Sequence, residues 1–198
     1  PLRGARAEVG AIAATFVAAG SRPERVGTLL GADATEPAVF ARAATARYLH
    51  FACHGLAEEF DGQSLSLLVL HQGTESSPGA DGLLKLDDLL RGWPLRLRGN
   101  RLVVLSACRT QVGATHRDEA PYALPFGFLV AGARAVVSSL WAVDDASTAE
   151  LMADFYRRLL AGDGGEQLAA FTAARKALRA THPDPFHWAA FVYVGVPQ

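Results

Sequence analysis

The feature that most constrains the fold is the apolar run RLVVLSAC at residues 101–108. A continuous run of this kind, rich in β-branched residues, is typical of a strand in a sheet that is covered on both faces. Three further compact apolar segments, ARYLHFAC (46–53), RAVVSSLW (134–141) and WAAFVYVG (188–195), predict strands of similar length. The chain therefore needs helices on both sides of a central sheet.

Helical segments lie between these strands. The spacing of Val9, Ile12 and Phe16 predicts a helix over residues 2–19, and amphipathic patterns predict two more over 144–164 and 166–180. We also expect short helices at 36–44, 84–90 and 123–133, and strands at 26–31 and 65–70. Strands that alternate with helices predict an α/β fold with a mostly parallel sheet.

Length and composition favour a single domain over residues 1–198. The chain has 198 residues, half of them apolar, which is enough for one core. The net charge is −1 with no long block of one sign, which excludes wholesale binding to nucleic acid or to an anionic membrane. No apolar stretch is long enough to span a membrane. The chain begins at Pro1, and we expect it to be the C-terminal part of a longer protein.

Cysteine usage favours a reducing compartment, and we expect the cytoplasm. Two cysteines in 198 residues do not form a disulfide scaffold. A zinc site built from Cys53, His54 and Cys108 lacks a fourth ligand and has no CxxC spacing, so we expect no metal. No other cofactor is indicated by the sequence.

Reactive side chains follow several of the predicted strands. His54 comes after the strand at 46–53, Cys108 ends the strand at 101–108, and Asp144 and Asp145 follow a third. In open α/β sheets ligands bind beyond the carboxyl ends of the strands. If the strands are parallel, these side chains lie at one edge of the sheet.

A cysteine and a histidine at neighbouring strand ends suit nucleophilic catalysis. A thiol becomes a strong nucleophile when a nearby imidazole removes its proton. We therefore predict His54 as the base and Cys108 as the nucleophile. The backbone N–H groups of Gly55 and Cys108 are candidate donors to a developing oxyanion.

Other polar residues have mainly structural interpretations. Cys53 should point to the opposite sheet face from His54 and pack in the core, which also argues against a redox pair with Cys108. Ser106 is structural or lines the same cleft as Cys108. Asp61 and Asp81 could orient His54, although acidic residues beside glycine are ordinary in turns. We expect structural or solvated roles for the remaining histidines, His50, His71, His116, His182 and His187.

Five segments of the chain resemble the CHAT domains, which are caspase-like peptidase domains related to separases. The segments are LHFACHG (49–55), VVLSACRTQVG (103–113), GFLVAGARAVVSSLWAVDDAST (127–148), LMADFYRRLLAG (151–162) and HWAAFVYVG (187–195). The SACRT at 106–110 carries the central Ala-Cys-Arg of the caspase signature, and His54 precedes Cys108 by 54 residues. The resemblance implies a three-layer α/β/α sandwich around a mostly parallel sheet of about six strands, and a cysteine endopeptidase with a His54–Cys108 dyad.

The resemblance also suggests a substrate pocket. A similar LW-x-V-x-D segment in separases helps to form the pocket for an arginine before the scissile bond, and the matching acid here is Asp145, with Asp144 beside it. Trp141 is close enough in sequence to line the same pocket, although sheet-edge packing also explains it. N-capping of the helix over 144–164 explains both aspartates without a substrate.

Two functions follow from these observations. The first is a cysteine endopeptidase that cleaves a protein or peptide substrate, in a longer protein whose N-terminal region, such as helical repeats, senses or recruits. The second is a catalytically latent module of the same fold that binds or regulates a partner. The presence of both dyad residues favours the first.

Overall fold

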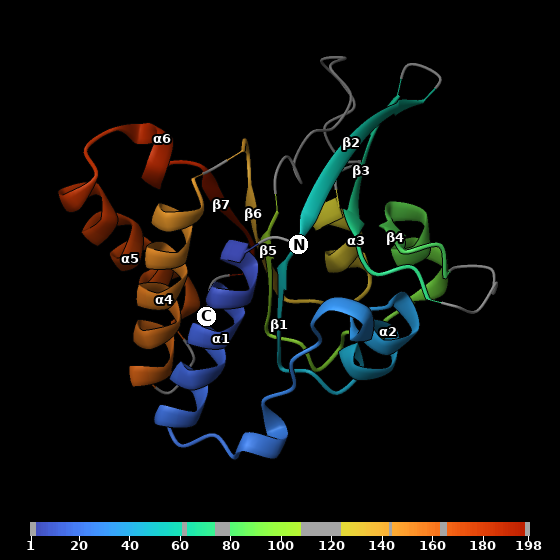
Figure 1. The fold of residues 1–198 in the computed structure, drawn as a ribbon, viewed down its shortest axis with the longest axis horizontal. Helices are drawn as coiled ribbons and strands as arrows, with labels where there is room; N and C mark the ends of the chain where they lie inside the picture. Colours follow the sequence, from blue (N-terminus) through green and yellow to red (C-terminus); the bar gives the residue numbers. More distant parts are fainter. Residues whose placement is uncertain are drawn as a thin grey trace.

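A four-stranded sheet lies at the centre of the computed structural model, which describes residues 3–60, 63–73, 80–107, 124–142, 144–162 and 166–196. The strand order is β1 (Tyr48–Ala52), β5 (Leu102–Ser106), β6 (Ala135–Ser139) and β7 (Phe191–Gly195). The pairs β1–β5 and β5–β6 are parallel, whereas β7 runs antiparallel to β6. The predicted α/β class and the mostly parallel sheet are confirmed (Figure 1).

The expected strand number of about six is wrong for the central sheet of the described residues, which has four. The segment predicted as a strand at 26–31 contains no strand. The segment follows one short 3-10 turn, η1 (Pro23–Arg25), and its last residue, Gly31, begins a second one, η2 (Gly31–Asp33). Gly31 has a φ of +57°, outside the extended region. The segment predicted at 65–70 is a strand, but it belongs to a second sheet.

This second sheet is antiparallel and consists of β2 (His54–Phe60), β3 (Gln63–Val69) and β4 (Leu83–Lys85). Only Cys53 separates the end of β1 from the start of β2, so the chain passes directly from the central sheet into the hairpin. Of the helix expected at 84–90, the first two residues belong to β4, and helical backbone begins at Leu86 and continues as a π-helical turn, η3 (Asp88–Gly92). This hairpin rises from the central sheet in Figure 1.

Helices cover both faces of the central sheet. One layer contains α1 (Arg3–Ala18), α4 (Asp145–Ala161) and α5 (Gln167–Thr181), with the short α6 (Pro185–Trp188) beside α5. The other contains α2 (Glu36–Ala43), α3 (Leu124–Val130) and η3. Among the described residues no helix is both long and apolar enough to cross a bilayer.

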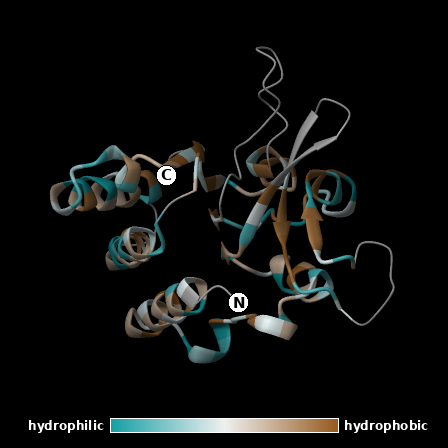
Figure 2. Ribbon diagram, turned by 45° about the horizontal axis from the view of Figure 1, so that its top comes forward, coloured by the Kyte–Doolittle hydropathy of each residue, from teal (hydrophilic) through white to brown (hydrophobic). Residues whose placement is uncertain are grey.

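Alternation along β5 explains why two cores form. Leu102 and Val104 pack into the cluster of α4 and α5, whereas Val103 and Leu105 pack into the cluster of α2 and α3. Successive residues of a strand point to opposite faces, so an unbroken apolar run supplies both cores at once. In Figure 2 the strands of the central sheet are mostly in hydrophobic colours, whereas the helices carry both hydrophilic and hydrophobic residues.

Aromatic residues fill the contact between the sheet and the helices α4 and α5. The rings of Phe155 and Phe171 lie 5.6 Å apart between centroids, and the ring of Tyr156 lies 5.2 Å from that of Phe155. All three side chains are fully buried. They hold α4 against the sheet, and the first turn of α4 lies at the candidate site.

Candidate active site

A small cleft lies at the carboxyl ends of β1 and β5. It has a volume of about 50 Å³, enough for a few water molecules. The described residues that line it come from three places, namely the first turns of α1, the ends of β1 and β5, and the first turn of α4: Gly4, Ala5, Glu8, Ala52, Cys53, His54, Ser106, Ala107, Asp145 and Thr148.

The register of the sheet brings the two predicted catalytic segments together. Ala52 of β1 pairs with Ser106 of β5 in a parallel ladder, so both segments leave the sheet at the same edge. His54 and Cys108 each follow these paired residues by two positions. Cys108 itself lies outside the described residues, which on this segment end at Ala107.

Ala107 is held by a buried hydrogen bond. The hydroxyl of Ser139, at the end of β6, donates to the Ala107 carbonyl, and both residues are buried. A buried bond of this kind restrains the backbone strongly, because breaking it leaves unpaired polar groups away from water. The residue immediately before Cys108 therefore has a defined position at the edge of the sheet.

His54 occupies the first position of β2 and is exposed to solvent. It pairs across the hairpin with Val69, and Gly55 pairs with Leu68. The hairpin therefore holds the imidazole at the lip of the cleft, and Gly55 lies next to it in the same strand. The expected place of His54, just beyond β1, is where the structure has it.

Cys53 belongs to the opposite face of the sheet. It packs, half-buried, against the cluster that contains Phe51 and Leu105, although it also borders the cleft. Burial raises the pKa of the Cys53 thiol to about 12, because an apolar environment disfavours the thiolate. At neutral pH Cys53 therefore stays in the thiol form. Cys53 is therefore a packing residue.

The two aspartates at the start of α4 have different roles. Asp144 is the N-cap, and its carboxylate accepts a 2.9 Å hydrogen bond from the Ser147 N–H. It is exposed and is not among the residues that line the cleft. Asp145, the first residue of α4, does line the cleft.

Asp145 lies against the first turn of α1. A Cβ atom built on Gly4 would be 2.6 Å from Asp145 Oδ2, so a larger residue at this position would require the Asp145 side chain to shift. A carboxylate at a helix N-terminus is favourable, because unpaired N–H groups give that end a partial positive charge. The start of α1 therefore covers one end of the cleft, next to Asp145.

Trp141 lies outside the cleft. Its indole Nε1–H donates to the Phe186 carbonyl at 3.2 Å, and its ring packs against the core beneath α4 and α5. Ser106 does line the cleft. Three of the predicted site residues therefore line the cleft, namely His54, Ser106 and Asp145, and Gly55 lies beside His54. Asp144 and Trp141 are not among the residues that line it.

Two cleft residues with polar side chains, Glu8 and Thr148, were missed by sequence reasoning. Glu8 is buried, and its carboxylate lies 3.1 Å from His50 Nε2, from which it accepts a hydrogen bond. The other ring nitrogen, His50 Nδ1, lies 3.2 Å from the Tyr156 hydroxyl. Thr148 follows Asp145 by one helical turn, and this i, i+3 spacing is the signal that points to it. No local pattern distinguishes Glu8, since its place depends on how α1 packs.

The other candidates lie elsewhere. Asp81 bonds to the Leu83 N–H and to Lys85 Nζ, and it is not among the cleft residues. Asp61 and His116 fall outside the described residues. Within the described ranges no group of three histidine, cysteine or acidic side chains could hold a metal ion.

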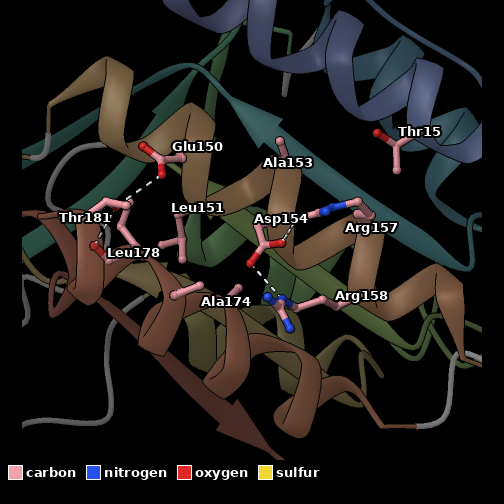
Figure 3. A pocket seen from close by; sticks show the side chains of 11 residues that line it. Thr15, Glu150, Leu151, Ala153, Asp154, Arg157, Arg158, Ala174, Leu178 and Thr181 are labelled. Atoms are coloured by element: carbon pink, nitrogen blue, oxygen red, sulfur yellow. Dashed lines mark hydrogen bonds and ion pairs between the residues drawn. The ribbon is translucent and has the colours of Figure 1, made fainter.

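A larger hollow of about 470 Å³ lies over α4 and α5 and shares no residue with the cleft (Figure 3). Its charged groups pair with each other. Asp154 binds Arg157 and Arg158, and Glu150 bonds to Thr181 and His182. The surface is therefore internally satisfied, and the cleft at His54 is the stronger candidate site.

The cap of α4 can be tested by substitution. Replacing Asp144 by alanine is expected to lower the thermal midpoint at neutral pH, whereas asparagine, which also caps helices, preserves most of it. The hydrogen bond from the Ser147 N–H lowers the pKa of Asp144, so its stabilisation is present above the unfolded value of about 3.9 and is lost as the pH falls through the folded value. Midpoints measured at neutral pH and at a pH of about 2 should show the wild-type advantage over alanine shrinking with acid. If the difference in thermal midpoint between wild type and the alanine variant is the same at both pH values, the role of the Asp144 carboxylate as the N-cap of α4 is contradicted.

Comparison with known families agrees with this architecture. A search of curated proteins finds no match to the chain. The family model described as CHAT domain matches residues 1–196, nearly the whole length. With its three-layer α/β fold and a cleft at the ends of β1 and β5, the chain belongs to the CHAT domain family, which is related to caspase-like cysteine peptidases.

Proposed function

We propose that this domain is a cysteine endopeptidase with a His54–Cys108 dyad. The observation that carries the proposal is the parallel pairing of Ala52 with Ser106, because it directs the segments of His54 and Cys108 to the same edge of the sheet. The cleft there is lined by His54 and by the two residues that precede Cys108. Its position agrees with the rule that ligands bind beyond the carboxyl ends of parallel strands.

The chemistry uses the imidazole twice. His54 takes the proton of Cys108, and the thiolate attacks the carbonyl carbon of the scissile peptide. The N–H groups of Gly55 and Cys108 donate to the oxyanion of the tetrahedral intermediate. His54 then gives its proton to the leaving amine, which produces a thioester. A water molecule, deprotonated by His54, hydrolyses this thioester and restores the thiol.

We propose a basic residue before the scissile bond. Asp145 is the principal candidate for the residue that receives it, with Ser106 beside it in the cleft. Glu8 adds a second carboxylate to the same lining. Neither lysine nor arginine is found among the described lining residues, so the charge of the cleft suits a cation.

One observation favours the second candidate, a latent module that binds a partner. The cleft holds only about 50 Å³, and the start of α1 lies directly over Asp145. A peptide side chain enters only if α1 or the neighbouring segments move. The latent module and the peptidase therefore differ in whether Cys108 is reactive in the full-length protein.

Labelling with a thiol-reactive peptide inhibitor distinguishes the two. At neutral pH we expect one label per chain, located on Cys108 by mass spectrometry of the digested protein. Cys53 should stay unlabelled, because its pKa of about 12 keeps it as the thiol. A His54→Ala variant serves as the matched control and should label more slowly. Labelling of neither cysteine, with or without the protein's partners, favours the latent module.

A further inference from the structure

Thr148 has a buried hydroxyl without a hydrogen-bond partner in the described part of the chain. The residue is 5% exposed and lines the cleft, and its Oγ1 atom is fully buried. Buried polar groups nearly always have partners, so an exception at a candidate active site calls for an explanation. A ligand that supplies a donor or acceptor is one such explanation.

The backbone of α4 does not satisfy this hydroxyl. A helical threonine commonly donates to a carbonyl three or four residues earlier, which here is that of Asp144 or Asp145. The Asp144 carbonyl already accepts from the Thr148 N–H at 3.0 Å and from the Ser147 hydroxyl at 3.2 Å. Thr148 Oγ1 thus keeps its hydrogen-bonding capacity for the cleft.

The electrostatics around Thr148 favour a cationic ligand. Asp145 and Glu8 contribute two carboxylates to the lining. The first turns of α1 and α4 oppose them, because each helix N-terminus is equivalent to about half a positive charge. Of these two carboxylates, Glu8 already bonds to His50, whereas Asp145 is exposed and can meet a ligand, and the described lining includes no lysine or arginine.

We propose that Thr148 is a specificity-determining residue that selects arginine over lysine at the position before the scissile bond. This inference rests on the proposed peptidase function and deepens it. Asp145 and Thr148 lie one turn apart on α4, and side chains at this spacing have Cβ atoms about 5–6 Å apart. Their acceptors are therefore spread over a distance that a planar guanidinium, with five N–H donors, can bridge. A lysine ammonium is a point charge that gains most of its energy from Asp145 alone.

The test compares arginyl and lysyl reporter peptides on the full chain with Thr148→Val, which keeps the shape and removes the hydroxyl. We expect kcat/KM for the arginyl reporter to fall about tenfold, the loss of one hydrogen bond to a charged group, and kcat/KM for the lysyl reporter to change less than about twofold. Thr148→Ser should restore the preference. Thr15→Val, a helix threonine outside the cleft whose hydroxyl bonds to the Ala11 carbonyl, is the matched control and should leave the ratio unchanged.

Thermal unfolding separates specificity from a structural role. Because the hydroxyl has no partner among the described residues, Thr148→Val should keep or raise the thermal midpoint. An unchanged arginine-to-lysine ratio in this variant, or an equal loss on both reporters with a lowered midpoint, overturns the inference while the peptidase assignment stands. If the wild-type protein cleaves neither reporter under conditions in which Cys108 is labelled, the specificity proposal is wrong. If Cys108 is also unreactive, the peptidase proposal fails as well.

Discussion

Replacing Cys108 by alanine is expected to reduce cleavage of an arginyl reporter by about a thousandfold or more. The variant lacks the sulfur that forms the thioester, so only the binding and oxyanion contributions of the site remain. His54→Ala should cause a loss of similar size, because an uncharged thiol without its base is a weak nucleophile. The double variant should be little worse than either single one, since the two groups act as a unit.

The matched control for this result is Cys53→Ala. Cys53 is the neighbour of His54 in the chain, but it packs against the core cluster that contains Phe51 and Leu105, and its pKa is raised to about 12. We expect this variant to cleave within about twofold of wild type. Steady-state kinetics with purified proteins, checked for folding by circular dichroism, measures all four variants. Wild-type cleavage by Cys108→Ala would falsify the peptidase proposal. Loss of cleavage in Cys53→Ala alone would show that Cys53, and not Cys108, is the nucleophile.

Replacing Phe155 by alanine should lower the free energy of unfolding by about 3–5 kcal/mol. The side chain is fully buried between α4, α5 and the sheet, and its ring contacts those of Tyr156 and Phe171. Removing it leaves a cavity that its ring neighbours cannot fill completely. A domain of this size has a total stability of about 5–15 kcal/mol, so the variant should be close to unfolding at physiological temperature.

Phe186→Ala is the control for the aromatic substitution. Phe186 is 45% exposed, and its hydrogen bond to Trp141 uses the backbone carbonyl, which alanine keeps. Its loss should cost less than about 1 kcal/mol. Urea unfolding followed by fluorescence gives both values. If the two alanine substitutions, at Phe155 and Phe186, lowered the free energy of unfolding equally, the core would not lie at the contact between α4, α5 and the sheet.

The strongly patterned segments were predictable from the sequence alone. The apolar run at 101–108 became β5, and the periodic segments at 2–19, 144–164 and 166–180 became α1, α4 and α5 within a few residues. These signals are strong because one segment has to satisfy a fixed period of burial. The segment at 26–31 has only three apolar residues in six and two glycines, so it is too short to show a period, and the strand expected there is absent.

The candidate site was predictable only in part. Strand ends predicted His54, Cys108, Asp144 and Asp145 at one edge, because in a parallel sheet all carboxyl ends meet there. Of the described ones, His54 and Asp145 line the cleft, as does Ser106, for which a structural role was the alternative. The helix-capping alternative correctly described Asp144, whose carboxylate bonds to the Ser147 N–H. Asp145, the next residue, lines the cleft instead, because Asp144 has the extended backbone of an N-cap and the helix begins only at Asp145.

The sequence by itself determined the α/β class, the family and the pairing of a histidine segment with a cysteine segment, because periodic burial and short motifs are properties of neighbouring residues. Only the tertiary structure decided that β2 begins at His54, that Gly4 of α1 lies against Asp145, and that Glu8 and the unpaired hydroxyl of Thr148 share the cleft with them. The contact of Gly4 with Asp145 and the shared cleft of Glu8 and Thr148 join residues 141 and 140 positions apart. They depend on how α1 and α4 pack across the sheet, which no local pattern records.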